Sequence, residues 1–160
     1  MIRYINWITL PSRICLKGGC HKCHTGNKKF DKSLIQYLDD LGCLDERKQL
    51  IHTIWIDEDD IKRISDSGSV VAYNPISNLK IGSGVMPFQA LKNAKIPICL
   101  GTNEAACDDT ANLWVATKIG ANIQRISMRE CSNWPSTDEL LGCVLERRSQ
   151  IISKCFNRPP

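Results

Sequence analysis

The sequence contains no long uninterrupted hydrophobic run, and no segment reaches the roughly 18 apolar residues that a membrane-spanning helix requires. Aromatic residues make up only 6% of the chain, and its net charge is a modest +4. Lysine and arginine are scattered, whereas a nucleic-acid surface needs a basic stripe interleaved with aromatic side chains. We therefore expect neither a membrane nor a nucleic acid as a partner.

The beginning of the chain, MIRYINWITLPSRICLKGG, lacks the continuous apolar segment of a secretory signal. The nine cysteines are an odd number, and most lie inside apolar patterns such as IPICLG and LLGCVLE. Buried cysteine packs as a small hydrophobic side chain, and thiols stay reduced in the cytosol. We expect a cytoplasmic protein whose cysteines do not form a disulfide framework.

The 160 residues, 42% of them hydrophobic, are enough for one domain with a packed core. Charged residues of both signs are mixed along the chain, which argues against disorder over most of its length. Residues 1–30 have an irregular pattern, which can include a remnant strand. We expect one βα domain over 31–155 and a loose tail over 156–160.

Helical and strand patterns alternate from residue 31 onward. Amphipathic spacing predicts helices over 31–42, 57–68, 86–94, 110–121 and 136–156. Nearly continuous apolar runs predict buried strands over 49–56, 69–73 and 96–101. Asp31 is expected to cap the first helix and Asp109 or Thr110 the fourth, and a capping box is expected to open the last. Strands that alternate with helices form a parallel sheet with right-handed crossovers.

Polar residues lie in or just past the three predicted strands. They are His52, Asn74 and Asn103, the last followed by Glu104. In parallel α/β sheets, functional groups gather at the carboxyl ends of the strands. Two structural interpretations stay open beside a functional one: His52 as a core histidine bonded to a backbone carbonyl, and NPISN over 74–78 as a turn.

Three segments carry a family resemblance: IHTIWID, AYNPISNLKIGSG and LGTNEAACDDTANLW. They resemble, in this order, the strand-six, strand-seven and strand-eight segments of the metal-dependent amidohydrolase superfamily. The nearest branch is that of the atrazine chlorohydrolases and the methylthioadenosine/adenosylhomocysteine deaminases. The likeness covers about residues 30–150, with the same order and spacing throughout.

The resemblance implies an α/β fold, namely the last three or four βα units of a (β/α)8 TIM-type barrel with parallel strands. Such barrels need ~250 residues. The family's early His-x-His pair is absent from this sequence. We therefore expect a truncated chain that holds only the later portion of the barrel.

The chemistry that the resemblance implies is hydrolytic cleavage of C–N or C–Cl bonds in small heterocycles such as aminopurines or triazines. A Zn or Fe ion lowers the pKa of a bound water to about 7. His52 matches the catalytic strand-six histidine, which polarises the water or the leaving group. Asn103 stands where the family has the aspartate that binds the metal and takes the proton, and Asn74 and Glu104 are expected to bind substrate. Because an amide oxygen cannot accept a proton near neutral pH, we expect impaired catalysis.

The segment CHKCH over 20–24 allows several interpretations. By resemblance, HKCHT aligns with the family's His-x-x-Glu-Thr, which makes His21 a metal ligand and puts His24 at the catalytic glutamate position. Cys-x-x-Cys-His is also the attachment pattern of c-type haem, which requires export. A zinc clip, with Cys15 as a third ligand, is a further alternative.

The leading interpretation is thus an amidohydrolase-family hydrolase or deaminase, truncated and catalytically impaired. The alternative is a non-catalytic half-barrel that serves as an oligomerisation or regulatory partner, as a homo-oligomer or docked on a full-length relative. An open parallel sheet favours it, because such a sheet leaves a strand edge and an apolar face uncovered. A third possibility is an incomplete gene product that folds poorly by itself.

Overall fold

The computed structural model describes residues 13–15, 32–103 and 111–145. Its centre is a sheet of four parallel strands in the order β1-β2-β3-β4. The strands are β1 Arg13–Cys15, β2 Gln49–Ile51, β3 Val70–Tyr73 and β4 Ile98–Leu100. Among the described strands β4 pairs only with β3 and therefore forms an edge of the sheet. The α/β class with parallel strands is as the sequence predicts.

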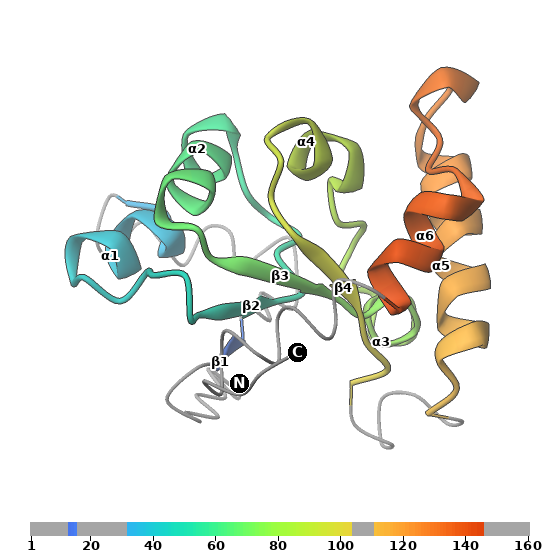
Figure 1. Ribbon diagram of the computed structural model, residues 1–160, viewed down its shortest axis with the longest axis horizontal. Coiled ribbons are helices and arrows are strands. Elements are labelled where there is room, and N and C mark those ends of the chain that lie inside the picture. Colours follow the sequence, from blue (N-terminus) through green and yellow to red (C-terminus); the bar gives the residue numbers. More distant parts are fainter. Residues whose placement is uncertain (1–12, 16–31, 104–110, 146–160) are drawn as a thin grey trace.

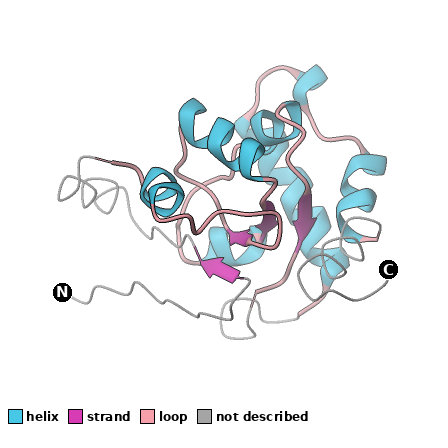
Figure 2. Cartoon of the chain, turned by 60° about the vertical axis from the view of Figure 1, so that its left-hand side comes forward, coloured by secondary structure: helices cyan, strands magenta, loops and turns pink. Residues whose placement is uncertain are grey.

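The helices alternate with the strands along the chain. They are α1 Leu34–Asp40, α2 Glu58–Ser67, α3 Pro75–Lys80, α4 Phe88–Asn93, α5 Leu113–Ser127 and α6 Thr137–Val144. Helices α1, α2 and α4 lie along one side of the sheet, and α5 and α6 lie together beside β4 (Figure 1). The turned view in Figure 2 shows the helices packed around the strands.

Local capping decides where the helices begin. The predicted caps of α2 are confirmed, because the Asp57 side chain accepts a hydrogen bond from the Asp60 backbone and Gly68 ends the helix with φ 70°. The capping box of α6, between Ser136 and Glu139, is confirmed as well.

The predicted Asp31 cap of α1 is wrong, because Ser33 caps that helix by accepting from the backbone N–H of Gln36. The part of the predicted last helix beyond residue 145 lies outside the described residues.

The predicted start of α5 at Asp109 or Thr110 is also wrong. Asn112 caps the helix, and its side-chain oxygen accepts from the backbone N–H groups of Trp114 and Val115 at 2.9 and 3.3 Å. Ala111 has φ 47°, a left-handed conformation that interrupts a right-handed helix just before this cap. The helix therefore begins three residues after the predicted start at Thr110, at Leu113.

Other elements also differ from the sequence-based expectation; helix α5, for example, continues to Ser127 and not only to residue 121. Strand β2 ends at Ile51 and not at residue 56, because His52 and Thr53 have φ 76° and 45° and leave the extended conformation. The segment NPISN is no simple turn, since Pro75 begins helix α3, a position that suits its fixed φ. Strand β1 pairs with β2 and lies in segment 1–30, for which the sequence allowed a remnant strand.

Both faces of the sheet are buried, as in other parallel sheets. Leu50, Val71 and Ile98 belong to the main core, whereas Val70 and Cys99 belong to a smaller cluster. Cys43, Cys99, Cys131 and Cys143 are thiols that take part in no disulfide, and Cys99 and Cys143 are buried. No helix in the described part of the chain is long and apolar enough to cross a membrane.

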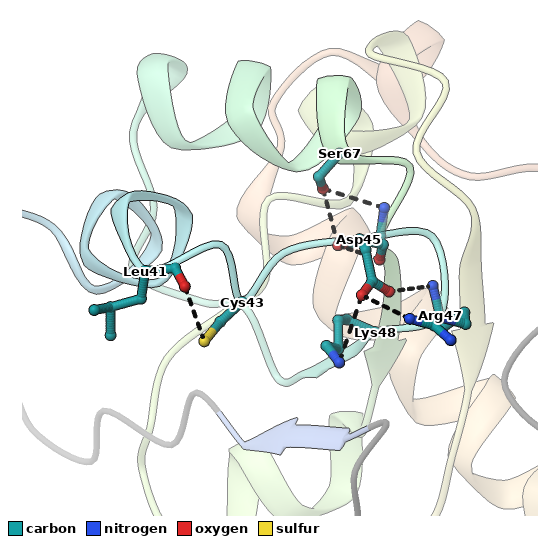
Figure 3. Close-up of polar contacts among 7 residues, drawn as sticks. Leu41, Cys43, Asp45, Arg47, Lys48 and Ser67 are labelled. Carbon is teal, nitrogen blue, oxygen red and sulfur yellow. Dashed lines mark hydrogen bonds and ion pairs between the residues drawn. The ribbon is translucent and has the colours of Figure 1, made fainter.

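A polar turn precedes β2, and Asp45 is its centre (Figure 3). The Asp45 carboxylate accepts a hydrogen bond from the Arg47 backbone N–H at 2.7 Å and lies 3.5 Å from the Lys48 ammonium. The Ser69 hydroxyl donates to the Asp45 carbonyl at 2.9 Å, which joins the turn to the start of β3. Partial burial raises the pKa of the Asp45 carboxyl, but the Arg47 N–H and the charges of Lys48 and Arg47 outweigh this effect and lower the pKa.

We expect Asp45→Asn to destabilise the protein at neutral pH by less than about 1 kcal/mol, because the pair is partly exposed and screened. A folded-state pKa below the ordinary 3.8 means that the carboxylate stabilises the fold above that pH and that the contribution is lost as pH falls through the folded pKa. Urea unfolding of both proteins should therefore show a difference at pH 7 that shrinks under acid conditions. An equal difference at both pH values would contradict this origin.

Candidate functional site

The carboxyl ends of β2, β3 and β4 lie at the same edge of the sheet, and each is followed by a predicted site residue. His52 follows β2, and its backbone N–H donates to the Ala72 carbonyl at 2.9 Å. Asn74 follows β3, and Asn103 comes three residues after the end of β4. The parallel register thus brings together three residues that are far apart in the sequence.

His52 is completely buried, and its imidazole contacts a side chain of α3. Its Nδ1 lies 2.5 Å from Oδ1 of Asn78, which is also buried. The positive φ of His52 turns the chain out of the strand at this residue. The open alternative of a core histidine bonded to a backbone carbonyl does not describe this contact, because the Nδ1 partner is a side-chain amide.

Asn103 makes the corresponding contact from β4 to the same helix. Its side-chain Nδ2 donates to Oγ of Ser77 at 2.9 Å, and Ser77 is completely buried. Asn103 is exposed and has φ 64°, a left-handed conformation that asparagine tolerates well. Helix α3 is therefore joined to the ends of both β2 and β4.

Sequence reasoning missed Ser77 and Asn78 as site residues. Their signal was present in NPISN, because Pro75 at the first helical position predicts a helix start as well as a turn. Both polar residues are buried on α3, which a solvent-exposed turn would not explain.

Asn74 is buried next to Gly101, the residue that follows β4. A Cβ atom at Gly101 would lie only 2.4 Å from Oδ1 of Asn74. The backbone N–H of Gly101 donates to the Tyr73 carbonyl at 2.9 Å, which holds the two strand ends at this separation. Glycine at position 101 is thus what leaves space for the Asn74 side chain.

Tyr73 supports the site from the core side of the sheet. Its hydroxyl accepts a hydrogen bond from Nε2 of Gln124 at 3.2 Å, and the same Nε2 donates to the Met86 carbonyl at 3.0 Å. Burial raises the pKa of Tyr73 to about 12, although the hydrogen bond from Gln124 acts in the opposite direction. The phenol therefore stays neutral near physiological pH and anchors α5 to β3.

The edge of the sheet at the carboxyl ends of β2, β3 and β4 is rich in side-chain amides and poor in metal ligands. Within residues 13–15, 32–103 and 111–145, no group of three or more His, Cys, Asp or Glu side chains is placed to hold a metal ion. The Asn103 amide is neutral, and it is engaged as a donor to Ser77. The predicted residues His21, His24 and Glu104, and with them the zinc-clip and haem interpretations of 20–24, lie outside the described residues. The described side chains by themselves do not fit a Zn or Fe ion.

The chain matches known sequences over most of its length. The model of the amidohydrolase family matches residues 21–141. A 5-methylthioadenosine/S-adenosylhomocysteine deaminase of Pyrococcus abyssi is 33% identical over 111 residues, which are 69% of this chain and 26% of that protein. A 5′-deoxyadenosine deaminase of Methanothrix thermoacetophila is 33% identical over 104 residues, which are 65% of this chain and 25% of that protein. The chain spans about a quarter of the length of these curated relatives.

Solved structures share the fold. Atrazine chlorohydrolase TrzN from Arthrobacter aurescens TC1, complexed with zinc, superposes with a TM-score of 0.77 at 22% identity over 92% of this chain and 32% of that one. An adenosine deaminase from Xanthomonas campestris with bound zinc gives a TM-score of 0.81 at 18% identity over 89% of this chain and 32% of that one. The family match confirms the resemblance noted in the sequence, and the names of the relatives agree with the deaminase branch. The chain belongs to the amidohydrolase family.

Proposed function

We propose that this chain is a portion of an amidohydrolase of the deaminase type, which acts on aminopurine nucleosides. We propose further that Asn103 impairs catalysis in this chain. The relatives are named for adenosine-type substrates, and the triazine hydrolases share the fold. Such substrates are small heterocycles with hydrogen-bonding ring nitrogens, which buried amides and an imidazole suit as partners. His52, Asn74 and Asn103 are the groups that the described strand ends offer to such a ring.

The observation that carries the proposal is the Asn103 side chain itself. It donates through Nδ2 to the Ser77 hydroxyl, and its amide oxygen cannot take a proton near neutral pH. The family resemblance puts a proton-accepting carboxylate at this position. Losing a positioned acid–base group typically costs about 10²- to 10⁴-fold in rate. The family's solved neighbours include zinc complexes, but the described residues of this chain do not supply a ligand set for that ion.

The test is ammonia release from 5′-methylthioadenosine, S-adenosylhomocysteine and 5′-deoxyadenosine, with added Zn²⁺ and with metal content measured on the same sample. We expect the unchanged chain to release no ammonia above the protein-free blank. Asn103→Asp is the matched variant, because it places a proton acceptor at the same atom position. Release by the variant alone would assign the impairment to this amide. Turnover by the unchanged chain, with one metal bound per molecule, would overturn the proposal.

Asn103→Asp should leave the fold intact, so that any difference in ammonia release between the two proteins reflects the side chain at position 103. Aspartate tolerates positive φ about as well as asparagine, and the Ser77 hydroxyl can donate to the new carboxylate in place of accepting from the amide. Because the position is exposed, the free energy of unfolding should change by no more than about 0.5 kcal/mol. Urea unfolding of both proteins checks this.

The proposal also covers the barrel architecture of the chain and its association with other chains. We propose that 31–155 is a partial (β/α)8 barrel, supported by its three parallel strands β2, β3 and β4 and by the share of the solved neighbours that the chain covers. The family match begins at residue 21, within the segment predicted as irregular. Association as a homo-oligomer, or docking on a full-length relative, stays a prediction, for which the edge position of β4 is the structural argument.

A further inference from the structure

We propose that Asn78 is a positioning residue that holds His52 in the neutral tautomer with its proton on Nδ1, so that Nε2 is the ring's acceptor. This inference deepens the proposed function and rests on it for its catalytic meaning. The tautomer of the buried imidazole itself depends only on the contact between His52, just after β2, and Asn78 in α3.

The contact itself determines which nitrogen carries the proton. Oδ1 of Asn78 lies 2.5 Å from Nδ1 of His52, which is within hydrogen-bond distance. An amide oxygen has lone pairs and no proton, so the ring nitrogen that faces it must be the donor. Both side chains are almost completely buried, and the low local dielectric strengthens a hydrogen bond that is shielded from water.

Both partners are held in place by their backbones. The Asn78 N–H donates to the Asn74 carbonyl at 3.0 Å, and its carbonyl accepts from the Ser83 N–H at 2.9 Å. On the other side, the His52 N–H donates to Ala72 in the adjacent strand. The neighbouring residue Ser77 is bonded to Asn103, which ties α3 to β4 as well. The backbones that carry the amide oxygen and the imidazole are therefore both held by hydrogen bonds to neighbouring elements.

The position of the ring proton determines which chemistry His52 can perform. Neutral histidine in water favours the tautomer with the proton on Nε2, so Asn78 imposes the less favoured form. With the proton on Nδ1, the Nε2 lone pair can accept a proton from a water molecule, whereas an Nε2–H could only donate to a leaving group. The resemblance leaves both activities open for His52, and Asn78 selects the one directed at water.

The experiment is a long-range ¹H–¹⁵N correlation spectrum of the full 160-residue chain labelled with ¹⁵N-histidine, without metal or substrate. The chain has three histidines, and the His52 ring is the one whose signals persist in both His21→Gln and His24→Gln. At a pH where the ring is neutral, we expect a protonated Nδ1 and an unprotonated Nε2. A proton on Nε2 of the unchanged chain would overturn the inference.

Two variants test the part played by Asn78. Asn78→Leu keeps a similar volume but removes the acceptor, so the ring should change to the Nε2–H tautomer. Asn78→Asp keeps an acceptor and should retain a protonated Nδ1. Ser83→Ala is the matched control, because it alters a buried side chain of the adjoining turn without removing the acceptor, and it should leave the tautomer unchanged. A protonated Nδ1 that persists in Asn78→Leu would overturn the inference.

The outcome is separate from that of the activity assay. If Asn78→Leu does not fold, the spectrum of the unchanged chain still decides. An Nε2–H tautomer would refute this inference and leave the proposed function in place. Ammonia release by the unchanged chain would refute the impaired function and leave the tautomer result in place.

Discussion

Phe88→Ala is expected to lower the free energy of unfolding by about 3–5 kcal/mol, the largest loss of stability that we predict for this chain. Phe88 is the first residue of α4 and is only 1% exposed. Its ring packs against that of Tyr73, with 6.3 Å between the centroids and a tilt of 51°. Truncation would remove this contact and leave a cavity between α4 and β3, because the surrounding core can collapse only in part.

Thermal and urea unfolding measure this loss. For a protein of this size, a loss of 1 kcal/mol lowers the melting temperature by roughly 2–4 °C, so the variant should melt about 6–20 °C lower. Val85→Ala is the matched control, because Val85 is close in sequence but 41% exposed, and its truncation should cost no more than about 0.5 kcal/mol. A Phe88→Ala variant as stable as this control would contradict the described core.

Gly101→Ala is expected to damage the site and the fold together. The added methyl group would lie 2.4 Å from Oδ1 of Asn74, far inside van der Waals contact. Asn74 is 4% exposed, so its side chain has little space into which it can turn. Overpacking of this kind typically costs about 1–3 kcal/mol. We therefore expect a less stable protein in which the Asn74 side chain has moved away from the strand ends.

A double-mutant cycle isolates this contact. Asn74→Ala removes the oxygen that the new methyl group meets, so Gly101→Ala should cost much less in that background than in the unchanged chain. Urea unfolding of the four proteins gives the interaction energy, and the side-chain amide signals of Asn74 in ¹H–¹⁵N spectra report its movement. Equal costs of Gly101→Ala in both backgrounds would contradict the steric explanation.

The sequence by itself determined the alternation of helices and parallel strands, because hydrophobic periodicity and short-range caps are local signals. The α2 helix shows this well: Asp57 and Gly68 predict both of its ends, and both are confirmed. The sequence also indicated that His52, Asn74 and Asn103 belong to one edge of the sheet, since parallel strands bring their carboxyl ends together. The family followed from the segments around these residues and is confirmed.

Local signals failed where several residues compete for the same position. Asn112 and Thr110 are both acceptable caps, and the left-handed conformation of Ala111 decided between them. In the same way, the apolar run after Gln49 continues to residue 56, yet the strand ends at Ile51. Positive φ at His52 ends it, and nothing in the residue types around it indicates that conformation.

Only the tertiary structure decided what the polar residues do. Asn78 bonds to His52 and Ser77 bonds to Asn103, and the two members of each pair are 26 residues apart in the sequence. Contacts at that separation arise when helix α3 packs across two strand ends, so no propensity of a single segment can predict them. The sequence thus determined which side chains reach the edge of the sheet, and packing determined which of them donate and which accept.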